Sequence, residues 1–325
     1  MHLEAASHGL PDDDRWRRLT ASSRKAEVFQ EDLYFRECWL DTQEVLAESG
    51  DAMLASTALL SFKCDGVAGR RMHRTLDFLA DHGFAVIGVE PVRLNRHSMR
   101  EVWRFNWHVY PVDRLNLMSV MHSASDSLLV VLRDTRYDGT VPGATRLADL
   151  KGAADPAKRK PHELRAVLEP PNSVINFVHV ADEPADVVRE LGIFLDRPQR
   201  RGLLASACRN AADDMRPAAQ AAVDELERRY PAHDLDLTAS LQRLSTDPAV
   251  STVGLDRVTA AVSGGLALSW DELVSVIGPA GAHGSVWDFV CVAAAVLPAK
   301  RESLTDLLPA VTADEWRAAV GGGVR

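Results

Sequence analysis

Between residues 58 and 195 the sequence alternates short apolar segments with segments of helical periodicity. The strand-like segments are 58–63, 84–92, 127–132 and 172–180. Apolar residues at helical spacing occupy 72–82, 98–107, 114–121 and 185–195. This order of strands and helices is typical of α+β domains. It predicts a ferredoxin-like split βαβ antiparallel sheet covered by helices.

Two regions of different texture flank this core. Residues 1–24 are polar and aperiodic, so we expect them to be partly disordered, and 27–49 then has helical spacing. The remainder is rich in Ala, Leu and Asp, with helical spacing at 205–229, 235–244, 255–262, 270–277, 286–296, 303–308 and 313–320. We therefore predict an N-terminal extension at 1–55, an α+β domain at 56–200 and an all-α domain at 201–325.

Composition narrows the class of protein. The 325 residues are 46% hydrophobic and 26% charged, with a formal net charge of -9, which suits a globular protein and argues against a general nucleic-acid binder. The four cysteines are far apart and form no CxxC pair, which indicates a reducing compartment and no zinc site. The apolar stretch 286–298 is too short to span a bilayer. We expect a cytoplasmic protein with no membrane partner.

One histidine stands where a strand-like segment meets a helix start. His179 follows the apolar run and precedes Asp182-Glu183-Pro184, a typical helix N-terminus. Glu190 lies on the following helix, where its carboxylate could orient the ring and set its tautomer. A lone histidine on an apolar strand is more often structural, so the interpretation depends on the residues upstream.

Two upstream features place positive charge near a sheet edge. Lys63 ends the first strand and precedes an Asp65-Gly66 turn, which suits a contact with a terminal phosphate, although a surface lysine before a turn fits as well. The loop 151–165 holds an excess of Lys and Arg in an acidic chain and is either a phosphate-binding or a solvated loop. Arg165, at its end, is the best candidate for a bidentate phosphate contact.

The order and spacing of these motifs resemble the nucleoside diphosphate kinase family over about residues 56–198. The family's Lys-Pro-Asp-Gly-Val is similar to Lys63-Cys64-Asp65-Gly66-Val67, its Gly-x-Thr-Asn-Pro-Ala segment to residues 152–157 running on to Leu164-Arg165, and its Asn-x-x-His-Gly-Ser-Asp to residues 176–182. The glutamate of its next helix is similar to Glu190. Several motifs in one order make the resemblance fairly specific.

The resemblance implies a role for each matching residue. His179 would carry the phosphate of a ping-pong transfer, with Glu190 bonded to its ring. Lys63 and Arg165 would hold the β and γ phosphates of ATP, and Asn176 would contact the sugar 3′-hydroxyl. Magnesium would travel with the nucleotide, so no protein metal site is expected. Relatives of this kind usually form homo-oligomers.

Other family positions are changed or unplaced. The phosphate-binding Thr falls on Ala154, and the Gly-Ser after the histidine is Val180-Ala181. The second arginine is Arg146 with a two-residue gap or Ala148 without one, and the aromatic that stacks on the base is Tyr110, Leu117 or Phe105. These changes suggest a slower or differently selective enzyme.

Three functions remain open at this point. The first is a divergent phosphotransferase that moves the γ-phosphate of ATP to a nucleotide or a specialised phosphorylated acceptor through phospho-His179. The second is a nucleotide-binding domain without turnover, motivated by Ala154, Val180 and Ala181. The third is a scaffold that recruits a protein partner through residues 201–325.

Overall fold

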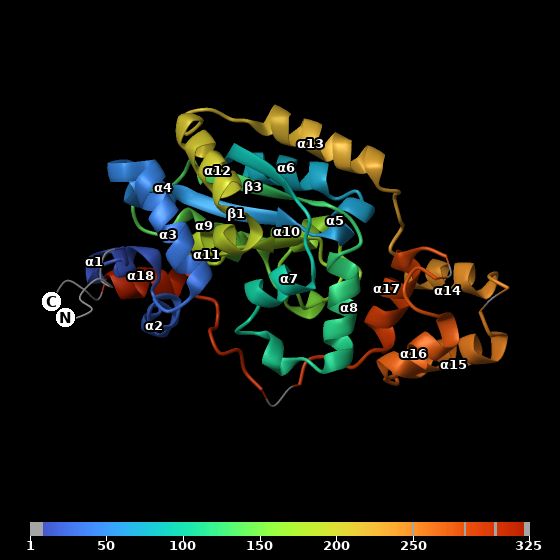
Figure 1. Ribbon diagram of the computed structural model, residues 1–325. Coiled ribbons are helices and arrows are strands. Elements are labelled where there is room, and N and C mark those ends of the chain that lie inside the picture. The colour runs from blue at the N-terminus through green and yellow to red at the C-terminus, as the bar shows by residue number, and fades with distance from the viewer. Residues whose placement is uncertain (1–8, 249, 283, 302–303, 322–325) are drawn as a thin grey trace.

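The computed structural model describes residues 9–248, 250–282, 284–301 and 304–321 (Figure 1). Its four-stranded sheet has the order β2-β3-β1-β4, and every neighbouring pair is antiparallel. The strands are β1 (Thr57–Phe62), β2 (Phe84–Val92), β3 (Ser127–Asp134) and β4 (Val178–Val180). The chain passes from β1 to β2 through helices and leaves room for β3 between them, which is the split βαβ arrangement. The predicted α+β fold is confirmed.

Helices cover both faces of the sheet, and as a result every residue of β1 is buried. On one face, α3 (Leu33–Leu46), α11 (Pro184–Phe194) and α12 (Arg197–Arg209) contact one another and enclose a small gap with Thr57 and Val131. A second group consists of α6 (Met72–Asp81), α9 (Gly143–Lys151) and α10 (Leu164–Leu168). Side chains alternate along a strand, so Ser61 shares the face of Thr57.

Local signals account for the helices that frame the β1 end of the sheet. In α7 (Arg96–Val102), Asn95 and Ser98 form a reciprocal capping box. Pro184 occupies the first turn of α11, where its missing N–H costs nothing. Helix α8 (Val112–His122) packs on α7, and its buried residues Leu117, Met121 and His122 face inward. Helix α5 (Cys64–Ala68) follows β1 directly and was not predicted.

Part of the N-terminal segment 1–24, which the sequence predicts to be partly disordered, is helical in the described residues. Helices α1 (Asp13–Leu19) and α2 (Ser23–Phe29) are N-capped by the Asp12 and Ser22 side chains. Polar residues of this region are used in tertiary contacts, since Lys25 Nζ donates to Asp186 Oδ2 at 2.7 Å. Residues 1–8 of the predicted disordered region lie outside the described residues.

Three other predicted elements differ from the structure. The strand expected at 172–180 contains only β4, because the backbone before it bonds to Asp65 rather than to a neighbouring strand. The helix expected at 205–229 is two helices, α12 and α13 (Arg216–Arg229), separated by a turn before Pro217. The described part of the helix expected at 303–308 is not helical, and Leu307 N donates to Phe105 O at 3.1 Å instead.

A helical lobe stands beside the sheet, at the right of Figure 1. It comprises α14 (Leu237–Ser245), α15 (Thr252–Gly264), α16 (Trp270–Ile277) and α17 (Val286–Val296). Helix α17 contacts α8, whose Arg114 donates to the carbonyls of Ala294, Leu297 and Pro298. Helices α12 and α13 contact β2. The domain boundary near residue 200 stays a prediction.

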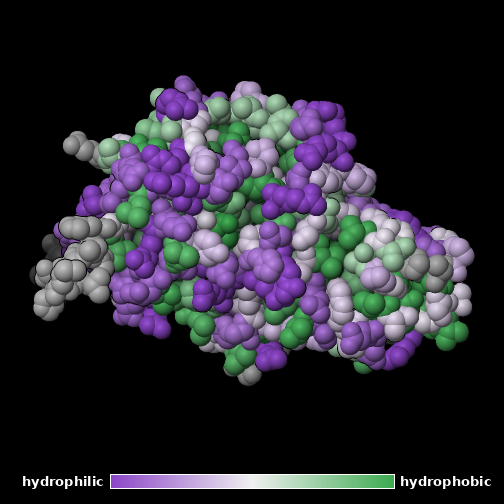
Figure 2. All heavy atoms as spheres, in the orientation of Figure 1, coloured by the Kyte–Doolittle hydropathy of each residue, from purple (hydrophilic) through white to green (hydrophobic). Residues whose placement is uncertain are grey.

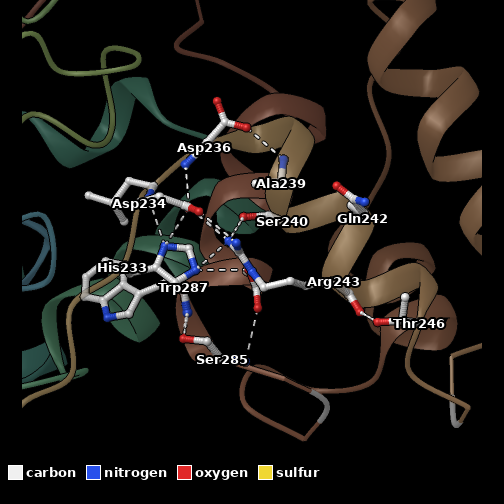
Figure 3. Close-up of polar contacts among 12 residues, drawn as sticks. His233, Asp234, Asp236, Ala239, Ser240, Gln242, Arg243, Thr246, Ser285 and Trp287 are labelled. Carbon is white, nitrogen blue, oxygen red and sulfur yellow. Dashed lines mark hydrogen bonds and ion pairs between the residues drawn. The ribbon is translucent and has the colours of Figure 1, made fainter.

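A polar network fastens this lobe to the link between α13 and α14 (Figure 3). The buried carboxylate of Asp288 is 3.0 Å from His233 Nε2 and 2.8 Å from Arg243 Nε. Leu235 N donates to His233 Nδ1, so the neutral ring carries its proton on Nε2 and donates it to Asp288. Arg243 also pairs with Asp234 at 2.7 Å. Both nitrogens of His233 are thus used in structural bonds.

Hydrophilic side chains dominate much of the surface over the sheet-containing part in Figure 2, and hydrophobic ones lie in small scattered patches. Within the described ranges, no helix combines the length and the apolar character needed to cross a bilayer.

Candidate functional site

The candidate site lies where β1 and β4 pair. His179 is directly opposite Ser61 across this pair, so its side chain points to the face covered by α11. There His179 Nε2 lies 2.8 Å from Glu190 Oε1. The two side chains are 13% and 7% exposed. The rings of His179 and Trp103 make an edge-to-face contact, with 5.1 Å between their centroids.

This contact sets the chemistry of the imidazole. A carboxylate can only accept, so the proton of neutral His179 lies on Nε2 and the lone pair lies on Nδ1. Nδ1 has no hydrogen-bond partner within the residues that the structure describes. The ring is therefore oriented on one side by Glu190 and Trp103, and its other nitrogen is a nucleophile.

The turn after β1 holds the loop that leads to His179. Asp65 Oδ2 accepts from the backbone N–H groups of Asn176 and Phe177, at 2.7 and 2.9 Å. Phe177 has a positive φ of 71°, and its carbonyl accepts from Lys63 N at 2.9 Å. A Cβ on Gly66 would lie 2.7 Å from the Phe177 carbonyl oxygen, so this close approach requires glycine. The Asp65-Gly66 turn thus positions the histidine strand.

Lys63 is almost fully buried in the same place. Its Nζ donates to Val174 O at 3.2 Å and lies 3.4 Å from Asp65 Oδ2. Burial lowers the pKa of Lys63, and the Asp65 carboxylate acts in the opposite direction. The ammonium group therefore faces the loop 172–177 that leads to His179.

Arg165 and Asn176 also come together beside β4. Arg165 Nη1 donates to Gly152 O at 2.9 Å, and Nη2 donates to Val178 O at 3.0 Å. Nη2 is also 3.5 Å from Asn176 Oδ1. Burial lowers the pKa of Arg165 to about 10. The guanidinium is engaged with backbone carbonyls, one of them in the strand that carries His179.

Within the part of the chain that the structure describes, several buried polar atoms around this site have no hydrogen-bond partner. They include Ser61 Oγ, Asp65 Oδ1, both ring nitrogens of His122, Arg165 Nε and Glu190 Oε2. Each such atom costs about 1–3 kcal/mol when it is left unpaired. Native proteins rarely tolerate several together, and a bound polar molecule commonly completes them. The cluster therefore has unmet capacity to bind a polar ligand.

Arg146 is not part of the site. Its guanidinium pairs with Asp134, donates to the His82 carbonyl and lies 4.0 Å over the Phe84 ring. Asp134 pairs with the first residue of β2, at the end of the sheet opposite Lys63. The assignment of Arg146 to phosphate binding is wrong for this geometry, because the arginine compensates a buried carboxylate instead.

The predicted base-stacking residues do not surround His179 either. Leu117 is fully buried in the core, which leaves no face of it for a base. Tyr110 contacts Trp107, with 5.8 Å between ring centroids, and lies near Lys300 and Asp306. Phe105 packs against Phe29 at 6.1 Å.

Sequence reasoning missed three residues close to His179. Trp103 contacts its ring, Ser61 opposes it across the β1–β4 pair, and His122 contacts Trp103 at 5.2 Å. Trp103 lies inside a segment predicted to be helical, but nothing there distinguishes it from a core aromatic. Ser61 becomes visible only through the strand register.

A cavity among the described residues lies away from His179. It has a volume of about 500 Å³ and lies between the end of α9, the loop 152–163 and the start of α18 (Ala313–Gly321). The lining includes Ala148, Asp149, Lys160, His162, Glu163 and Asp314. Within this loop, Arg159 donates to four backbone carbonyls. Part of the basic charge of this loop is therefore structural.

Comparison with known proteins finds similarity to solved structures only. No family model matches the chain, and no curated protein matches its sequence. A nucleoside diphosphate kinase from Aquifex aeolicus is 17% identical with a TM-score of 0.36, over 44% of this chain and 97% of that one. The enzyme from Halobacterium salinarum in complex with CDP has 19% identity and a TM-score of 0.35, over 44% and 89% of the two chains. A nucleoside diphosphate kinase family protein from Babesia bovis has 16% identity and a TM-score of 0.35, over 44% and 90%.

Proposed function

We propose that this chain is a phosphotransferase that forms phospho-His179 and passes the phosphate to a nucleotide or a specialised phosphorylated acceptor. The observation that carries the proposal is the 2.8 Å contact between His179 Nε2 and Glu190 Oε1, which leaves Nδ1 as the free nucleophile. The motif resemblance of residues 56–198 to nucleoside diphosphate kinases suggests ATP as the donor.

In the first step, the Nδ1 lone pair attacks the γ-phosphorus of ATP. The bond between that phosphorus and the bridging oxygen breaks, and ADP leaves with the electron pair. The imidazole becomes positively charged, and the Glu190 carboxylate stabilises it through Nε2–H. In the second step, a terminal phosphate oxygen of the acceptor attacks the phosphorus and His179 is restored.

The remaining residues supply position and charge. Lys63 contributes positive charge next to the loop before His179, and Arg165 and Asn176 flank the strand that carries it. No group of three or more His, Cys, Asp or Glu in the described part of the chain could hold a metal ion. Following the motif resemblance, we place magnesium on the nucleotide, as part of the substrate.

A second candidate function is nucleotide binding or scaffolding without turnover. It is favoured by the engagement of Lys63 and Arg165 with backbone carbonyls, since a substrate phosphate must compete with those bonds. The hydroxyl-free residues Ala154 and Ala181 point the same way. In both cases we propose a cytoplasmic homo-oligomer that binds a protein partner through residues 201–325.

A labelling and chase experiment separates the two functions. The protein is incubated with [γ-³²P]ATP and Mg²⁺, freed of nucleotide and mixed with single unlabelled nucleoside diphosphates. Acid-labile label on the wild type, and its transfer to an acceptor, support the phosphotransferase. The label should be lost in His179→Ala and kept in His97→Ala, which removes an exposed histidine elsewhere. ATP binding without label favours nucleotide binding without turnover. If the protein neither binds ATP nor takes up label, the scaffold role remains.

A further inference from the structure

A second histidine contacts Trp103, the side chain that also contacts His179, and its ring has no hydrogen bond among the described residues. His122 is the last residue of α8 and is 0% exposed. Both Nδ1 and Nε2 are buried without a partner. Its backbone carbonyl is held by the Cys64 thiol, at 3.2 Å. A buried imidazole normally bonds through at least one nitrogen, so two unbonded ring nitrogens are unusual.

The surroundings of His122 are basic. Its ring centroid is 5.2 Å from that of Trp103, which in turn contacts His179 at 5.1 Å. Burial, Lys63 and His179 each lower the pKa of His122, so the ring is neutral at rest. The two nearby carboxylates are already engaged, Asp65 with the loop backbone and Lys63, and Glu190 with His179.

Three basic groups thus meet in one buried place, and one of them has two free nitrogens. A small anion with several acceptor oxygens is the kind of ligand that fits such a group of basic side chains. We propose that His122 binds the phosphoryl group carried by His179, as a second basic ligand beside Lys63. This inference rests on the proposed phosphorylation of His179. The phosphoryl dianion raises the proton affinity of His122, which takes one proton from solvent and donates an N–H to a phosphoryl oxygen.

The alternative is that His122 only fills space between Trp103 and the sheet. That role predicts a neutral ring in both states of the protein. The proposal predicts a protonated ring when His179 is phosphorylated and a neutral one when it is not. The protonation state of His122 therefore separates the two directly.

The test phosphorylates His179 without a nucleotide. Phosphoramidate, a small chemical donor for histidine, is added to the full chain labelled with ¹⁵N-histidine, and NMR follows the ring nitrogens. The His122 signals are identified by their absence in His122→Asn, and those of His179 by their absence in His179→Ala. The expected result is a change of both His122 nitrogens from the neutral to the protonated pattern. His122 signals that stay neutral while His179 is phosphorylated overturn the inference, as does a failure of phosphoramidate to modify His179.

A second readout is the lifetime of the phosphorylated protein. Loss of a hydrogen bond to a charged group should shorten the phospho-His179 half-life about tenfold in His122→Asn. His73→Asn, which alters a half-buried histidine on α6 that bonds Asp224, should leave it unchanged. Equal half-lives in all three proteins contradict the proposal. If phosphoramidate gives the His122 response but ATP gives no label, the proposed function fails and this inference stands.

Discussion

The role assigned to Glu190 predicts a graded loss of phosphorylation rate. Glu190→Ala removes the 2.8 Å contact that orients His179 and stabilises its developing positive charge. A hydrogen bond to a charged group contributes roughly 1.5–3 kcal/mol, which corresponds to about a 10- to 150-fold slower formation of phospho-His179. Glu190→Gln keeps a neutral acceptor of the same shape. We expect it to be slower by about 5- to 10-fold, because neutral hydrogen bonds are roughly half as strong.

Stability should respond differently from rate. One oxygen of Glu190 is buried without a hydrogen-bond partner among the described residues, so the folded protein bears the desolvation cost of a partly unpaired charge. Glu190→Gln should therefore leave the melting temperature unchanged or raise it. The rate is measured by rapid quench with [γ-³²P]ATP, and thermal unfolding is followed by circular dichroism.

Glu183→Gln is the matched control for both measurements. It removes another buried carboxylate, at the start of the same helix, that bonds Lys25 rather than His179. Its rate should equal that of the wild type at temperatures where both are folded. Equal rates in wild type and Glu190→Ala, or a fall in rate only where the protein unfolds, would refute the catalytic role of this contact.

The structure makes three further predictions. Arg146→Ala should lower the free energy of unfolding in urea by roughly 3 kcal/mol, because Asp134 is left as a buried unpaired charge. The labelling rate per folded molecule should stay unchanged. A selective loss of labelling would show that Arg146 takes part in phosphate binding. Burial raises the pKa of Asp186 to about 7, above its value in the unfolded chain, so the folded state binds a proton more tightly than the unfolded state. The free energy of unfolding should therefore fall as the pH rises from about 4 to 7. Asp186→Asn should flatten that part of the pH–stability curve, and an unchanged slope would contradict the assignment. Burial raises the pKa of the Cys38 thiol to about 12, so iodoacetamide should modify half-buried Cys208 before Cys38. Peptide mass spectrometry measures the order, and early modification of Cys38 would contradict its burial.

The fold was largely predictable because its strands are continuous apolar runs. The predicted bounds of β2 agree with the structure, and those of β1 and β3 are close. Helices cover both faces of the sheet, so most strand residues are buried and apolar. The segment before β4 reads equally well as a strand. Its backbone instead takes a positive φ at Phe177 and bonds to Asp65, a contact that no local pattern shows.

The candidate site was predictable only where a motif keeps its residues adjacent. Lys63, Asn176, Arg165, His179 and Glu190 lie in the structure around the same pair of strands. Their motifs are short, and each is fixed to one element. The roles of residues farther away in the sequence depend on which helix ends lie next to one another, and tertiary packing determines those contacts.

Two residues show that limit clearly. Arg146 needed a gap in its motif, and the structure places it against Asp134 at the far end of the sheet. His122 carried no signal at all, because its importance comes from two unbonded nitrogens in a fully buried place. The helical lobe offered no site in sequence, and its most polar cluster, around Asp288, is satisfied within itself.

The most direct test of the account is the identity of the phosphorylated nitrogen. The protein is phosphorylated with ATP and Mg²⁺, denatured at alkaline pH and examined by ³¹P NMR against the two phosphohistidine isomers. Because Glu190 holds Nε2, the account predicts phosphate on Nδ1 of His179 and none in His179→Ala. Phosphate on Nε2, or on a residue other than His179, would contradict it.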